Sequence, residues 1–182
     1  MDLQPQPIWI GDSRHQPVGD TVQGDYITML GERYYRIAHY DRLPPFFMSV
    51  VSSSDHWLFI SSTGGLSAGR VNAELALFPY YTVDKITENS ENTGSKTILL
   101  VRQGDHTSLW EPFSARYQGI YRIERHLYKN IAGDALIFEE MNHTLGLSFR
   151  YAWRTSDQYG FVKTGWLHNL SGESREVQLL DG

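Results

Sequence analysis

Cysteine is absent from the 182-residue sequence. This absence excludes a disulfide framework, a thiolate zinc site and a cysteine nucleophile. It suits a reducing cytoplasm, which is where we expect the protein to work. At the N-terminus no basic start is followed by an apolar run, so no signal peptide is visible. Nowhere do about 18 apolar residues run together, so we expect no membrane span.

Positive charge is also scarce, since 16 Lys and Arg stand against 21 Asp and Glu, for a net charge of −5. No local Lys/Arg cluster compensates, which argues against nucleic acid as a partner. The seven histidines never fall at H-x-H or H-x-x-x-H spacing. The glycine-rich run Gly64–Arg70 lacks the Gly-Lys-Ser/Thr ending of a P-loop and the spacing of a dinucleotide fingerprint. We therefore expect no cofactor and no metal.

Aromatic residues are abundant, at 13% of the chain, and such residues favour half-buried, pleated surfaces. The clearest alternation runs over Leu145–Arg154, where Leu147, Phe149 and Tyr151 share one face and Arg150 lies on the other. Further strand-like runs are expected at Ile8–Ile10, Tyr26–Leu30, Tyr34–Tyr40, Phe46–Val51, His56–Ser61, Ile98–Arg102, Gly119–Lys129, Ala135–Glu140, Phe161–Leu170 and Val177–Leu180. No segment keeps an apolar period of 3.6. We predict an all-β fold, a large two-sheet antiparallel sandwich in one domain spanning residues 1–182.

Two stretches depart from this strand pattern. Residues 1–24 form a Pro- and Gly-containing extended lead-in, and residues 61–96 lose the alternation and suggest a long functional or interface loop with one short helical or irregular piece. Within Gly64–Lys85 lies a set of polar and aromatic side chains of the kind that grips sugars or protein partners. The set comprises Arg70, Asn72, Tyr80, Tyr81, Asp84 and Lys85. Carbohydrate contact, an interdomain or subunit contact, and packing of the loop on itself all remain open.

The carboxylate pair Glu139-Glu140 invites comparison with a glycosidase. Neighbours on a strand point to opposite faces, so the two groups cannot flank one glycosidic bond, and we expect one solvated and one paired glutamate. Asp55-His56 lies near serines, but no Gly-x-Ser-x-Gly elbow accompanies it. We therefore assign no catalytic residue.

Several longer runs resemble the N-terminal region of large bacterial proteins related to cellobiose phosphorylase. These runs are Ser54–Arg70 (SDHWLFISSTGGLSAGR), Leu77–Ile86 (LFPYYTVDKI), Tyr121–Asn130 (YRIERHLYKN) and Val177–Gly182 (VQLLDG). The resemblance implies a β-supersandwich of the galactose-mutarotase type, followed by a helical linker and an (α/α)₆ barrel that carries the general-acid carboxylate. The catalytic group would then lie beyond Gly182. The abrupt end after an apolar strand-like run likewise suggests a fragment truncated at its C-terminus.

On this basis we expect a noncatalytic N-terminal sandwich domain of a carbohydrate-active enzyme, a glycoside phosphorylase or hydrolase. It would provide scaffold, interdomain and sugar contacts, with an oligosaccharide or sugar, the barrel of the same protein and a second copy as partners. One alternative is a freestanding mutarotase-like sugar epimerase, for which Glu124 and His126 share a strand face and could serve as acid and base. Another is a structural protein-interaction module.

Overall fold

The computed structural model describes residues 7–10, 13–14, 21–77, 82–88, 91, 94–116 and 118–182. Its strands are β1 (Trp9–Ile10), β2 (Ser13–Arg14), β3 (Gln23–Met29), β4 (Glu32–Ala38), β5 (Phe47–Val50), β6 (His56–Ser61), β7 (Leu66–Arg70), β8 (Thr97–Gln103), β9 (His106–Trp110), β10 (Ile123–Asn130), β11 (Ala135–Asn142), β12 (Leu147–Ser156), β13 (Gly160–Asn169) and β14 (Glu176–Asp181). Helical structure is confined to α1 (Val83–Glu88) and the 3₁₀ turns η1 (Tyr40–Arg42) and η2 (Ala73–Leu75) within these residues. The all-β prediction is confirmed.

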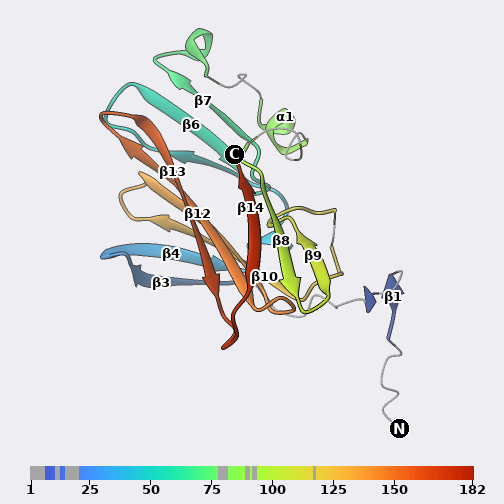
Figure 1. Ribbon diagram of the computed structural model, residues 1–182. Helices are drawn as coiled ribbons and strands as arrows, with labels where there is room; N and C mark the ends of the chain where they lie inside the picture. Colours follow the sequence, from blue (N-terminus) through green and yellow to red (C-terminus); the bar gives the residue numbers. More distant parts are fainter. Residues whose placement is uncertain are drawn as a thin grey trace.

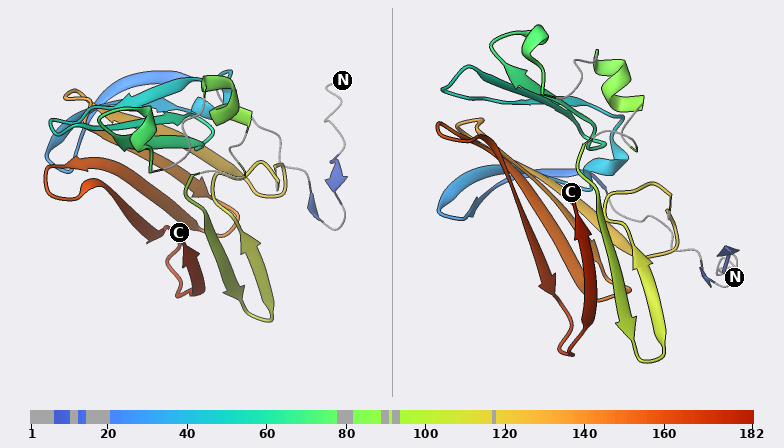
Figure 2. Two further views of the ribbon diagram at one scale, coloured as in Figure 1. Left: turned by 90° about the horizontal axis from the view of Figure 1, so that it is seen from above. Right: turned by 45° about the horizontal axis from the view of Figure 1, so that its top comes forward.

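All strand pairs in the described residues are antiparallel (Figure 1). A six-stranded sheet has the order β13-β12-β11-β10-β4-β3, two three-stranded sheets have the orders β14-β8-β9 and β5-β6-β7, and β1 pairs with β2. Figure 2 shows the two three-stranded sheets as separate groups beside the large sheet. The β3–β4 hairpin turns at Leu30 and Gly31, whose φ angles of 54° and 79° are those of a two-residue type I′ turn.

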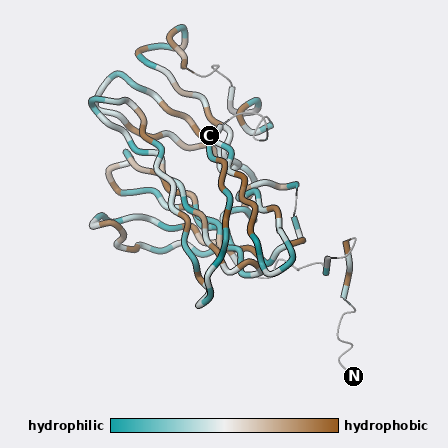
Figure 3. Tube along the Cα trace, in the orientation of Figure 1, coloured by the Kyte–Doolittle hydropathy of each residue, from teal (hydrophilic) through white to brown (hydrophobic). Residues whose placement is uncertain are grey.

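The main core lies between one face of the large sheet and the two three-stranded sheets. Leu136 and Phe138 from β11 pack there with Leu58 and Ile60 from β6 and Leu99 from β8, and all five are at most 2% exposed. Polar and apolar residues are interspersed along the long strands, as Figure 3 shows. Because successive side chains point to opposite faces, each strand of the large sheet contributes alternate residues to this core. The molecule is thus a sandwich with one large sheet in one layer.

The opposite face of the large sheet, which we call the open face, carries a second apolar cluster. Its buried members are Tyr34, Tyr128, Ala135, Ile137 and Ala152, with Ile27, Met29 and Trp166 packed against them. All of these residues belong to the large sheet, so within the described ranges no other element contributes to the cluster. The apolar cluster of the open face is therefore formed within the large sheet itself.

Three strands lie outside the predicted strand-like runs, and one of them is the two-residue β2 in the expected lead-in. β7 lies inside the stretch expected to be a loop, where it pairs with β6. Four of its five residues are buried, so it lacks the alternation that a half-buried strand shows. β9 was not predicted either, because its sequence HTSLW is mostly polar. In the part of the chain that the structure describes, no helix is long and apolar enough to cross a membrane.

Candidate functional site

The residues predicted from the loop at 64–85 fall into three groups. Arg70 and Lys85 are exposed, at the end of β7 and within α1. The Asn72 side-chain oxygen caps η2 by accepting hydrogen bonds from the backbone amides of Glu74 (3.1 Å) and Leu75 (3.2 Å). The remaining three, Tyr80, Tyr81 and the side chain of Asp84, lie outside the described residues. A sugar or interdomain contact by this loop stays a prediction.

The adjacent glutamates of β11 point to opposite faces, as predicted. The expectation that one is solvated was wrong, since Glu139 and Glu140 are 5% and 2% exposed. Glu140 faces the core and accepts hydrogen bonds from Arg125 Nε, Trp110 Nε1 and the Phe113 amide, each at 2.7 Å. Glu139 lies on the open face. Both carboxylates are buried because each has its own set of donors.

A row of polar and aromatic side chains crosses the open face on four adjacent strands. The strand registers place His126 opposite Glu139, Glu139 opposite Arg150, and Arg150 opposite Trp166. Directly opposed residues of antiparallel strands have Cβ atoms about 4.5–5.5 Å apart, so neighbours in this row are in reach of one another. We call these four residues the cross-strand row. The row joins residues that are 40 positions apart in the sequence, from 126 to 166.

Glu139 is the anionic centre of the cross-strand row. Arg150 Nη2 donates to Glu139 Oε1 at 2.5 Å, and the Tyr128 hydroxyl donates to Glu139 Oε2. Burial, and then the bond to Glu139, raise the pKa of Tyr128 above its usual value, so the phenol remains a neutral donor. Arg150 Nε is covered by the protein and has no hydrogen-bond partner among the described residues. The guanidinium is therefore held in place while part of its donor capacity is unused.

His126 is the neutral base of the same row. Burial lowers its pKa below the ordinary value of 6.5, with further lowering from His39 and Arg36 and an opposing effect of Glu139 and Glu124. The His39 ring meets His126 edge-on, with ring centroids 5.4 Å apart. His126 Nδ1 has no hydrogen-bond partner among the described residues. The imidazole is consequently uncharged at neutral pH.

Glu124 sits between two imidazoles at one side of the row. Its Oε2 lies 3.8 Å from His126 Nε2, and its Oε1 lies 2.9 Å from His143 Nε2. The second contact is short but its angle does not qualify as a hydrogen bond. The Glu124 side chain is 33% exposed, whereas that of His126 is 8% exposed. Glu124 is thus the group of this cluster that a ligand on the open face can touch.

Sequence reasoning identified Glu124 and His126 as sharing a face, and the structure confirms it. It missed Arg150 and Trp166 as neighbours of this pair. The signal for Arg150 was present in the alternation of β12, but its partner depends on strand order and register, which a single sequence does not encode locally.

The described residues contain no group of three or more His, Asp or Glu side chains placed to hold a metal ion. Neither the protein-family models nor the curated proteins include one that matches the chain.

Proposed function

We propose that the open face binds carbohydrate. The observation that carries this proposal is the cross-strand row, in which the half-buried Trp166 lies beside a half-buried guanidinium that the buried Glu139 carboxylate orients. Aromatic faces pack against the C–H faces of sugar rings, while planar polar groups bond to pairs of hydroxyls. Arg150 offers guanidinium donors at a position that its bond to Glu139 fixes.

The test is isothermal titration with cellobiose and glucose at millimolar concentration, on the wild type and on Trp166→Ala. Removing the ring should weaken binding by about tenfold or more, as expected for a central aromatic contact. Trp9→Ala is the matched control, because Trp9 is 60% exposed in β1, outside the large sheet. A flat titration on the wild type, or equal affinity of Trp166→Ala, would remove the open face as a sugar site.

A second candidate function, proton transfer on a free sugar, is favoured by the position of Glu124 between His126 and His143. A base that takes the anomeric hydroxyl proton, and an acid that protonates the ring oxygen, open the sugar ring and allow the anomers to interconvert. In this proposal Glu124 accepts the proton of the anomeric hydroxyl and, as the carboxylic acid, returns it to the ring oxygen, so no proton is gained or lost. His126 and His143 lie on either side of the carboxylate.

Polarimetry of freshly dissolved α-D-glucose measures this activity directly. Glu124→Gln keeps the shape of the side chain and removes the base, so it should return the rate to that of buffer. Trp166→Ala should weaken sugar affinity without altering the chemistry at saturation. If the wild type does not exceed the buffer rate, the proposed proton transfer is refuted, and sugar binding at this face is decided by the titration alone.

We further propose that the chain is the noncatalytic sandwich domain of a cytoplasmic carbohydrate-active enzyme related to cellobiose phosphorylase, in contact with an (α/α)₆ barrel or a second copy. The resembling runs and the all-β sandwich support this. So does the outer face of the β14-β8-β9 sheet, where Leu100, Leu109 and Leu180 are 39%, 37% and 68% exposed. A reading frame that continues past Gly182 into helical hairpins would support the proposal. One that continues into unrelated sequence would defeat it without affecting the sugar test.

A further inference from the structure

A cavity of about 240 Å³ lies on the core side of the large sheet, away from the open face. Its lining includes Phe138 of β11, Tyr151 of β12 and Tyr40 of η1. Gly64 and Phe113 line other parts of the wall. This volume is far above the roughly 10–15 Å³ that one water molecule needs. The cavity is thus large enough for a small molecule.

Two buried tyrosine hydroxyls face this cavity without partners. Tyr40 and Tyr151 are 4% and 5% exposed, and neither hydroxyl makes a hydrogen bond to a described residue. Neither hydroxyl oxygen is among the fully covered unpartnered atoms, so each keeps some exposed surface. Both residues line the cavity. Buried hydroxyls are normally hydrogen-bonded, so these two groups point to a ligand that supplies the partner.

The Tyr151 hydroxyl is also reachable from the opposite wall. A Cβ built on Gly64 would lie 3.7 Å from Tyr151 Oη, and the φ of Gly64 is 93°, which favours glycine. The aromatic rings around the cavity are ordered by mutual packing. Tyr151 stacks on Phe138 at 5.0 Å and meets Phe113 edge-on at 5.1 Å between ring centroids. The hydroxyls are therefore presented from fixed rings.

A cationic donor adds to the two hydroxyls. Arg125 lines the cavity, and its Nε and Nη2 are used by Glu140 (2.7 Å) and the Ser114 carbonyl (2.9 Å). Its Nη1 makes no hydrogen bond to a described residue and, like the two hydroxyls, is not among the fully covered atoms. Because the Glu140 carboxylate already neutralises the guanidinium, Nη1 would act on a ligand as a hydrogen-bond donor and not as a net positive charge.

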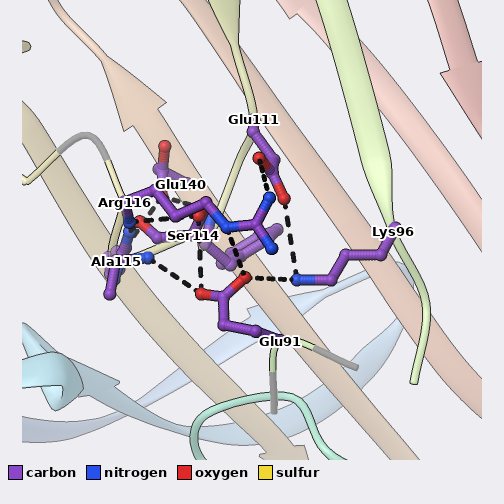
Figure 4. A network of polar contacts seen from close by, with 9 residues as sticks. Glu91, Lys96, Glu111, Ser114, Ala115, Arg116 and Glu140 are labelled. Atoms are coloured by element: carbon purple, nitrogen blue, oxygen red, sulfur yellow. Dashed lines mark hydrogen bonds and ion pairs between the residues drawn. The ribbon is translucent and has the colours of Figure 1, made fainter. Parts of the chain in front are cut away.

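A network of ion pairs reaches the cavity through Glu91, one of the lining residues (Figure 4). Glu91 is paired with Lys96 at 2.7 Å and with Arg116 at 3.6 Å. Glu111 lies 3.6 Å from Lys96 and 3.9 Å from Arg116. Exposed Asp41 lines the cavity and makes no ion pair among the described residues. Among the charged residues that line the cavity, Asp41 and Glu91 are carboxylates, and Arg125 is a cation that Glu140 neutralises.

This balance disfavours an anion, and the Arg125 guanidinium, which has donors and no acceptor, disfavours a cation. We propose that the cavity is a binding site for a small neutral polyhydroxylated molecule, of about monosaccharide size. Its hydroxyls accept hydrogen bonds from Tyr40, Tyr151 and Arg125 and donate to Asp41, while its C–H faces pack on the aromatic rings. The site is separate from the open face, and it does not depend on the function proposed there.

The experiment uses NMR chemical shifts with D-glucose, myo-inositol and sodium acetate as probes. Each is added to about 100 mM, at which a ligand with a millimolar dissociation constant saturates its site. The backbone amides of Gly64 and Phe113 report on the cavity, and the indole N–H of Trp166 reports on the open face. We expect at least one neutral polyol to shift the two amides saturably, and acetate to leave them unchanged.

The decisive variant is Tyr40→Phe combined with Tyr151→Phe, which removes both hydroxyls and keeps both rings. It should weaken polyol binding at the cavity by about tenfold or more, since each lost hydrogen bond accounts for a several-fold change. Each single variant should lose part of the polyol affinity, and the single variants replace the double variant as the test if the double variant does not fold. Tyr159→Phe is the control, because Tyr159 is 72% exposed.

Three results would overturn the proposal. The first is that no polyol shifts the amides of Gly64 and Phe113, in which case the cavity holds only water. The second is that the shifts persist in the double variant. The third is that acetate shifts them as strongly as the polyols do. If only the Trp166 indole responds, sugar binds to the open face and the cavity proposal fails alone.

Discussion

Glu140 is the residue whose replacement should most clearly test how the core is held together. Three donors converge on it at 2.7 Å: the Arg125 guanidinium, the Trp110 indole and the Phe113 amide. The side chains of Arg125 and Glu140 are 14% and 2% exposed. Glu140→Gln keeps the volume and one acceptor oxygen but leaves the guanidinium without a counter-charge. Removing one partner of a buried ion pair costs about 3–5 kcal/mol, because the remaining charge stays out of water.

This loss in the free energy of unfolding can be measured as a shift in melting temperature. For a domain of this size each kcal/mol corresponds to about 2–4 °C, so the melting temperature should fall by about 6–20 °C. Urea denaturation followed by tryptophan fluorescence gives the free energy of unfolding. Glu176→Ala is the control, since Glu176 pairs with Arg102 at 3.5 Å with both side chains at least 60% exposed. Its cost should stay within about 0.5 kcal/mol.

A double-mutant cycle separates the charge pair from the hydrogen bonds around it. Arg125→Met alone leaves Glu140 as an unpaired buried carboxylate, whereas Arg125→Met with Glu140→Gln leaves no charge at all. The double variant should therefore lose about 1–3 kcal/mol less than the sum of the single variants. If Glu140→Gln costs no more than Glu176→Ala, water reaches the guanidinium, and the argument from buried charge is refuted.

Three further predictions concern other parts of the fold. Burial lowers the pKa of His126 below 6.5, so the unfolded chain binds the proton more readily, and the free energy of unfolding should fall as the pH drops below about 6.5. Urea titrations at several pH values should show a flatter pH dependence for His126→Gln, and an unchanged slope would contradict this prediction. In Gly69→Ala the new Cβ would lie 2.4 Å from Trp57 Cζ2 and 2.8 Å from Ala76 Cα, so the free energy of unfolding from urea denaturation should fall by about 1–3 kcal/mol. Gly172→Ala is the control and should not change it, because a Cβ at Gly172 would meet open space. Asn72→Ala should lower the free energy of unfolding by about 0.5–1 kcal/mol, because the cap of η2 is lost, and should leave the cellobiose affinity measured by titration unchanged. Weaker cellobiose binding with an unchanged free energy of unfolding would instead favour Asn72 as a sugar contact.

The core-facing residues were predictable wherever a strand is buried on one face. β12 is the clearest case, because Leu147, Phe149 and Tyr151 were assigned to one face and all three lie in the main core. Such alternation is a local property, since it depends on the pleat of a single strand. The prediction fails for β7, which is buried on both faces and has no alternation to detect.

The candidate site was much less predictable, because it depends on contacts between distant strands. β10 pairs on one side with its sequence neighbour β11 and on the other with β4, which precedes it by some 85 residues. Nothing in either strand specifies this partner, and a slip by one residue would exchange the two faces. The hydroxyls of Tyr40 and Tyr151, which have no hydrogen-bond partner among the described residues, were equally unpredictable, because their surroundings depend on segments that are distant in the sequence.

The adjacent glutamates of β11 show how one strand serves both layers of structure. Glu140 satisfies donors on the core side, including the Arg125 guanidinium that lines the cavity, while Glu139 orients Arg150 on the open face. A solvated carboxylate could not do either, because water would compete for the donors and the side chain would not be fixed. Both groups must therefore be buried, which is costly unless each is fully paired. The pairing of two neighbouring carboxylates with separate cations on opposite faces is thus what allows the large sheet to carry two distinct polar sites.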